Sequence, residues 1–149
     1  MIIFSEYQIK NMVLKNRIVM PPMCMFIAGA DGMPNDFHYT HYATRAVGGV
    51  GLIIVEATGV TPNGRFSNHD LGIWSDAHIE GMKKIVDLCK PYGSKMAIQL
   101  NHAGRKCEAD ADYIVAPSPI SFSETSRQPV ELSKEEIREI TLSFRDAAR

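Results

Sequence analysis

One continuous apolar run constrains the fold of this chain more than any other feature. Residues 51–56 read Gly-Leu-Ile-Ile-Val-Glu, without alternation of apolar and polar positions. Such a run is typical of a strand that is buried on both faces, as in a parallel sheet covered by helices. The run therefore favours an α/β fold.

Two further strands are predicted on either side of this run. The segment Arg17–Met20 stops against Pro21 and Pro22, which cannot donate to a strand ladder, so the chain must leave the sheet there. Residues 95–100 predict a third strand that leads into the loop 101–105. Two β-prone stretches near the start, 2–4 and 8–14, predict an N-terminal hairpin.

Three helices are predicted between and after these strands. The first covers 37–47, stops at Gly48-Gly49 and turns Tyr42, Ala43 and Ala46 inward. The second is capped by Ser75 or Asp76 and carries apolar residues at helical spacing, namely Ile79, Met82, Ile85, Val86 and Cys89. About thirty irregular residues follow the third strand. A capping box of Ser133 and Glu136 then opens a helix whose apolar face contains Ile137, Ile140, Phe144 and Ala147.

This order of elements gives three βα units, which predict a parallel sheet with helices outside it. A closed (β/α)8 barrel needs eight such units and about 250 residues, against the 149 present. The apolar period of the last helix still runs at Ala147 with no residue that would stop it. We therefore expect 1–149 to be part of a domain that is cut within its third helix, with an exposed sheet edge.

Ligand sites in such folds collect at the carboxyl ends of the strands, here Pro21–Phe26, Glu56–Thr58 and Gln99–Arg105. Cys24 follows the double proline and so faces this expected pocket, although its spacing alone favours a buried, inert thiol slightly. Gln99 could contact a flat polar ligand or be a satisfied amide at the sheet end.

Composition narrows the classes of partner. The 16 Lys and Arg residues nearly balance 17 Asp and Glu residues, so no basic field for nucleic acid is present. No apolar run approaches the roughly 20 residues of a membrane span, and the start lacks a secretory signal, so we expect a cytoplasmic protein without membrane contact. The partner is then a small molecule or another protein.

Several cofactor motifs are absent from the sequence. No GxGxxG or phosphate-binding loop occurs, which disfavours a dinucleotide-binding Rossmann domain. The three cysteines are widely spaced and suggest free thiols rather than disulfides or a metal knuckle. His38 and His41 lie three residues apart on a helix, but no carboxylate or cysteine stands nearby at ligand spacing, so we predict no metal.

Taken together, five motifs resemble the Old Yellow Enzyme family, in particular its bacterial NADPH dehydrogenase and ene-reductase branch with a cysteine after strand one. They are Leu14–Met20 with Pro22–Met25, Gly51–Ala57, Gly64-Arg65, Leu71–Trp74 and Gln99–Arg105. The resemblance implies the N-terminal portion of an FMN-containing (β/α)8 TIM barrel. It also implies hydride transfer from NAD(P)H to the flavin and onward to an electron-poor alkene.

The resemblance also assigns residues. Pro21, Pro22, Met23 and Cys24 would run along the flavin, with the Cys24 thiol near its O4 and N5 edge, where it tunes the reduction potential. Ala57 would leave room for the ring, and Gln99 would hydrogen-bond its pyrimidine side. His102 and Arg105 would lie at the pocket edge.

Two departures from the family pattern stand out. Phe26 replaces the usual tyrosine of the substrate wall, so the aromatic surface is kept and one hydrogen bond is lost. The chain also ends before the family's paired substrate-binding histidines, tyrosine proton donor, flavin-contacting arginine and phosphate site.

Two alternatives stay open. The chain could be a non-catalytic half-barrel that self-associates as a homo-oligomer or pairs with a complementing C-terminal chain. It could also belong to a flavin oxidoreductase of the same superfamily with further fused domains, such as a dienoyl-CoA reductase or an amine dehydrogenase.

Overall fold

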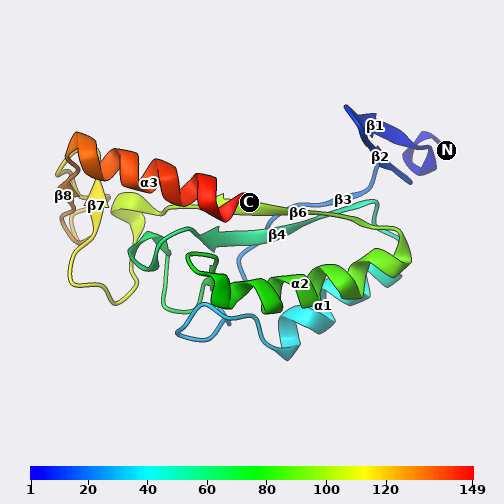
Figure 1. The fold of residues 1–149 in the computed structure, drawn as a ribbon, viewed down its shortest axis with the longest axis horizontal. Coiled ribbons are helices and arrows are strands. Elements are labelled where there is room, and N and C mark those ends of the chain that lie inside the picture. Colours follow the sequence, from blue (N-terminus) through cyan, green and yellow to red (C-terminus); the bar gives the residue numbers. More distant parts are fainter.

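A parallel sheet forms the centre of the computed structural model, which describes all residues 1–149. Strand β4 (Leu52–Gly59) lies in the middle and pairs along its length with β6 (Lys95–Asn101). Its other edge holds two short strands, β3 (Val19–Met20) near its start and β5 (Leu71–Gly72) at its end. All these pairings are parallel, which confirms the α/β prediction (Figure 1).

Strand β4 is buried at every position except the half-buried Ile54, as its unbroken apolar run predicted. It is longer than expected, because Thr58 and Gly59 still pair with β5 on one edge and with β6 on the other. The segment Glu56–Thr58, predicted as a loop, therefore lies within the strand. Strand β3 is shorter than predicted, and its Val19 is exposed while Met20 is buried.

Helices α1 (Asp36–Val47) and α2 (Ile79–Cys89) pack together on one side of the sheet (Figure 1). Their buried residues join the main core with β4. Ala43, predicted to face inward, is only half-buried. The predicted cap of α2 is wrong: a 3-10 turn, η3 (Asp76–His78), follows Ser75, and no side chain caps α2.

Helix α3 (Lys134–Ala147) runs alongside β6, apart from the packed pair α1 and α2 (Figure 1). The predicted capping box is confirmed, because Ser133 Oγ accepts from the Glu136 N–H at 3.2 Å and Glu136 Oε2 accepts from the Ser133 N–H at 2.7 Å. None of its residues is fully buried, so its apolar face is only partly covered. The preceding stretch, predicted as irregular, contains a short parallel ladder of β7 (Val115–Ala116) and β8 (Val130–Glu131).

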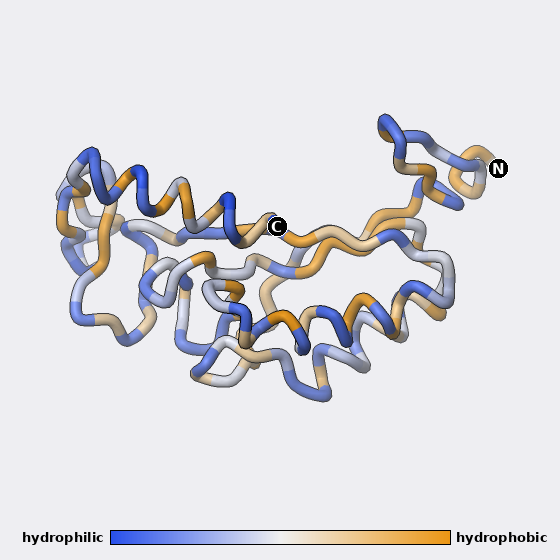
Figure 2. The backbone as a smooth tube through the Cα atoms, in the orientation of Figure 1, coloured by the Kyte–Doolittle hydropathy of each residue, from blue (hydrophilic) through white to orange (hydrophobic).

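The N-terminal segment projects from the body of the molecule and carries apolar residues with it (Figures 1 and 2). The predicted hairpin is present as β1 (Tyr7–Ile9) and β2 (Met12–Leu14). Residues 2–4, predicted as β-prone, instead form a 3-10 turn, η1 (Ile2–Phe4), because they find no strand to pair with. Ile2 is 76% exposed and Phe4 62%.

Three more 3-10 turns complete the chain: η2 (Pro62–Gly64), η4 (Lys90–Tyr92) and η5 (Gly104–Lys106). No helix is long and apolar enough to cross a membrane.

Candidate functional site

The segments predicted to carry the chemistry meet at the carboxyl end of the sheet. The loop Pro21–Phe26 follows β3, and Ala57 of β4 lies opposite Gln99 of β6 in the strand register. The Ala57 backbone N–H lies near enough to the Cys24 thiol to lower the pKa of that thiol, which places the loop against β4. The loop Pro21–Phe26 and strand β6 therefore come together at Ala57.

The side chains at this meeting point remain open on one side. Gln99 is exposed, and its amide makes no hydrogen bond within the chain. Met23 is 54% exposed and Phe26 50%, while Cys24 and Pro22 are half-buried. The Gln99 amide thus has unused donor and acceptor groups, while Ala57 beside it is buried.

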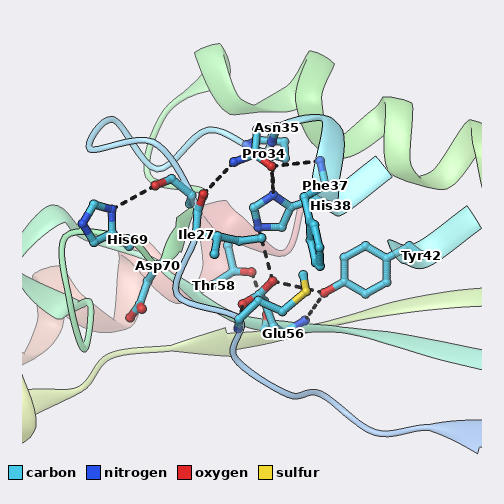
Figure 3. Close-up of polar contacts among 12 residues, drawn as sticks. Ile27, Pro34, Asn35, Phe37, His38, Tyr42, Glu56, Thr58, His69 and Asp70 are labelled. Atoms are coloured by element: carbon cyan, nitrogen blue, oxygen red, sulfur yellow. Dashed lines mark hydrogen bonds and ion pairs between the residues drawn. The ribbon is translucent and has the colours of Figure 1, made fainter. Parts of the chain in front are cut away.

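Beneath this open surface lies a buried carboxylate that the sequence prediction did not identify. The register of β4 against β6 shifts between Val55 and Ala57, so Glu56 occupies a β-bulge. A bulge re-aims the side chain of its extra residue. The Glu56 side chain turns into the space between β4, α1 and the loop Pro21–Phe26, and the residue is 1% exposed (Figure 3).

Three groups surround this carboxylate. Glu56 Oε2 accepts a hydrogen bond from the Met25 backbone N–H at 2.7 Å. The Tyr42 hydroxyl donates to Glu56 Oε1 at 3.4 Å and accepts from the Glu56 N–H at 3.0 Å. His38 Nε2 lies 3.4 Å from the same Oε1 (Figure 3). A buried carboxylate is tolerated only when it has partners, and the hydrogen bonds from Met25 and Tyr42 supply them, whereas His38 Nε2 makes no hydrogen bond.

The bond to Met25 holds the loop in a conformation that a bulky residue rarely adopts. The next residue, Phe26, has φ of +54° and lies in the left-handed region. Such a backbone persists only where its surroundings fix it. Glu56 therefore helps to set the direction of the Phe26 side chain and the position of Cys24 beside it.

The local charges keep Cys24 protonated at neutral pH. Burial raises the pKa of its thiol, and the nearby carboxylates of Asp70 and Glu56 raise this pKa further. Hydrogen bonding from the Ala57 N–H acts in the opposite direction with a smaller effect. Cys24 is half-buried, not fully buried as its spacing suggested, and is poised as a weak hydrogen-bond donor rather than a thiolate nucleophile.

The two histidines considered as metal ligands have other surroundings. His38 Nδ1 interacts with Asn35 at the start of α1, and its Nε2 faces Glu56. The His41 ring stacks on Phe37. No group of three or more His, Cys, Asp or Glu side chains is arranged to hold a metal ion.

Two signals in the sequence could have indicated the buried network. Glu56 follows a wholly apolar run, where a charged residue needs a partner. The inward face of α1, extended back four residues from Tyr42, reaches His38, and both side chains are buried.

The chain matches the model of a known protein family. The family model described as NADH:flavin oxidoreductase / NADH oxidase matches residues 2–149. The chain belongs to this flavin oxidoreductase family. Among its relatives are NADPH dehydrogenases from Clostridium acetobutylicum, 60% identical over 99% of this chain, and from Bacillus subtilis, 54% identical over 98%.

Solved structures of the same family share the fold. Morphinone reductase matches 98% of this chain with a TM-score of 0.88 at 29% identity, covering 43% of its own length. Old Yellow Enzyme from Pichia sp. matches 99% with a TM-score of 0.90 at 29% identity, covering 42%. The two NADPH dehydrogenases are likewise covered over 43% of their length. The chain thus spans less than half the length of these relatives and has the fold of the N-terminal part of their TIM barrel, without closing a barrel itself.

Proposed function

We propose that these residues are the N-terminal part of an FMN-dependent NAD(P)H oxidoreductase of Old Yellow Enzyme type, which reduces electron-poor alkenes. One observation supports the proposal most directly. In a chain of this family, Cys24, Ala57 and Gln99 lie at the carboxyl ends of adjacent parallel strands, where ligands bind in such folds.

The residues at this end fit a flavin ring. Gln99 offers an exposed amide with no partner in the chain, suited to the polar edge of a flat heterocycle. Ala57 beside it carries only a methyl group, so a ring can approach β4. Bound FMN would supply the hydride-accepting and hydride-donating centre.

The remaining residues of the loop have supporting roles in this proposal. Pro21 and Pro22 carry the chain out of the sheet, and Met23 offers an exposed apolar wall for the ring. The neutral Cys24 thiol donates a weak hydrogen bond that tunes the flavin potential. Phe26 borders the alkene substrate with an aromatic face and no hydroxyl.

We further propose that the catalytic protein contains more chain than these residues. The edge of β6 away from β4 has no partner strand, and the N-terminal apolar segment is exposed. A continuation of the barrel, whether joined to residue 149 or supplied by a complementing chain or a homo-oligomer, would cover both. We place this protein in the cytoplasm.

The alternative, a non-catalytic half-barrel that self-associates, is favoured by the same exposed N-terminal segment. Ile2, Phe4 and Ile9 could pack against a second copy. Strict monomeric behaviour of the folded 149-residue chain in analytical ultracentrifugation would contradict it.

A hybrid protein tests the proposed activity. In this hybrid, the 149 residues replace the matching N-terminal part of the NADPH dehydrogenase from Clostridium acetobutylicum. We expect NADPH oxidation that depends on added cyclohexenone, with ping-pong kinetics. A folded hybrid that neither oxidises NADPH nor reduces the enone would contradict the proposal.

A further inference from the structure

A hollow with positively charged side chains in its wall lies next to the loop Pro21–Phe26. The hollow has a volume of about 490 Å³ and is half open to solvent. Its wall contains three aromatic rings, Phe26, Phe66 and Phe122, and three cationic side chains, Arg105, Lys106 and Arg127. Three hydroxyl groups, from Ser67, Thr125 and Ser126, complete the polar part of the lining.

The cations of this hollow are not neutralised by the chain. None of the three lies within 4.0 Å of a carboxylate, since the ion pairs of the structure involve other residues. Glu108 is the one carboxylate in the wall, against three positive charges. Unpaired positive charge gathered around one hollow attracts anions.

Two of the cations are held over an aromatic ring. Lys106 Nζ lies 4.3 Å from the centre of the Phe122 ring, and Arg105 Cζ lies 5.9 Å from it. Arg127 has a structural task as well, because its guanidinium donates to the backbone carbonyls of Ala109 and Ala111. Arg105 and Lys106 are therefore the side chains that remain free to bind an anionic group.

We propose that this hollow binds a ligand that joins a flat apolar body to a carboxylate or phosphate group. The anionic group would pair with Arg105 and Lys106, and the flat body would lie against the phenylalanine rings. The hydroxyl groups of Thr125 and Ser126 would contact the remaining anionic oxygens, whereas the Ser67 hydroxyl already donates to Asp70.

This inference deepens the proposed function, on which its biological meaning rests, because Phe26 borders both the hollow and the flavin-side surface. Two ligands of that reaction would bring the required group. One is an unsaturated substrate with a carboxylate, and the other is NADPH through its 2′-phosphate. Both present an anionic group on a molecule with a flat part.

Calorimetric binding to the hybrid distinguishes these sources with two matched pairs of probes. Benzoate is compared with neutral benzamide, and adenosine 2′-monophosphate with adenosine. We expect at least one anion to bind about tenfold more tightly than its neutral counterpart, as for one charge-assisted contact. Raising the salt concentration should weaken that preference.

The variants Arg105→Gln and Lys106→Gln test the site itself, since both side chains are exposed and neither makes a hydrogen bond within the fold. Each should remove most of the preference for the anion. Arg138→Gln and Lys134→Gln are the matched controls, because these residues are exposed on α3 and do not line the hollow. The controls should bind as the unmodified hybrid does.

Preference for benzoate alone would identify a carboxylate substrate, and preference for the 2′-phosphate alone would identify NADPH. Equal binding of both members of each pair, or a preference that survives both variants, would overturn the inference. The test needs no hydride transfer. An inactive hybrid that still prefers anions would contradict only the proposed function, and an active hybrid without the preference would contradict only this inference.

Discussion

The ends of β4 and β6 lie side by side in register, yet their side chains have opposite surroundings. Glu56 of β4 is buried, and its carboxylate is in contact with Met25, Tyr42 and His38. Gln99 of β6, one residue further along, is exposed and has no partner for its amide. The loop Pro21–Phe26 and helix α1 cover the end of β4. The end of β6 is uncovered, and its Gln99 amide is free to bind a group outside these residues.

The largest effect should follow from removing the buried carboxylate. In the hybrid, Glu56→Ala leaves the Met25 N–H and the Tyr42 hydroxyl without their carboxylate partner inside the core. We expect the free energy of unfolding to fall by about 3 kcal/mol, as when a buried polar network is broken. Urea unfolding followed by tryptophan fluorescence measures this. Glu139→Ala, at an exposed position on α3, is the control, and equal stability of both variants would remove the distinction between the two strand ends.

The next effect should appear at β6 and should concern binding rather than folding. Gln99→Ala removes an exposed amide, so we expect the free energy of unfolding to change by less than about 0.5 kcal/mol. The affinity of the hybrid for FMN should fall about tenfold, which corresponds to one or two hydrogen bonds. Flavin release by equilibrium dialysis gives this number. A large loss of stability with unchanged flavin affinity would show that Gln99 supports the fold instead.

The sequence predicted the elements that depend on local signals, but not those that depend on pairing between distant segments. The apolar run of β4, the double proline after β3 and the Ser133–Glu136 cap are local signals, and each predicted its element correctly. The ends of β3 and β4 were misplaced because they depend on pairing with strands distant in the sequence. Residues 2–4 have strand propensity, but no neighbouring strand is available to them.

The candidate site divides in the same way. Pro21, Cys24, Ala57 and Gln99 could be selected because each stands at a strand end or in a family motif. The buried network could not be derived from periodicity alone, because a β-bulge turns Glu56 toward α1. The cationic hollow depends on segments that are brought together only by the fold.

A smaller effect is expected at the loop that Glu56 supports. Cys24→Ser keeps a hydrogen-bond donor of similar size but changes its strength and polarity. The midpoint potential of the flavin in the hybrid should shift by about 20–30 mV, as for a free-energy change of about 1 kcal/mol in a two-electron couple. Flavin content should stay unchanged. Spectroelectrochemical titration measures the shift, and an unchanged potential would exclude a tuning role for the thiol.

The smallest effect concerns the rate at which Cys24 reacts. Because burial and the carboxylates of Asp70 and Glu56 raise its pKa above the usual 9.0, the fraction of thiolate at pH 8 should be lower than in a free cysteine. Alkylation of Cys24 by iodoacetamide, followed by peptide mass spectrometry, should have its midpoint above pH 9. A midpoint below that value would show that the Ala57 N–H outweighs the carboxylates.

The most direct test of the whole account compares the flavin absorbance of the hybrid with that of the 149-residue chain purified alone. The account predicts about one FMN per hybrid chain, bleached by NADPH under anaerobic conditions. It predicts little flavin on the isolated chain, since the resemblance places the flavin-contacting arginine and the phosphate site outside these residues. A folded hybrid without bound flavin would contradict the assignment of Cys24, Ala57 and Gln99 as a flavin surface.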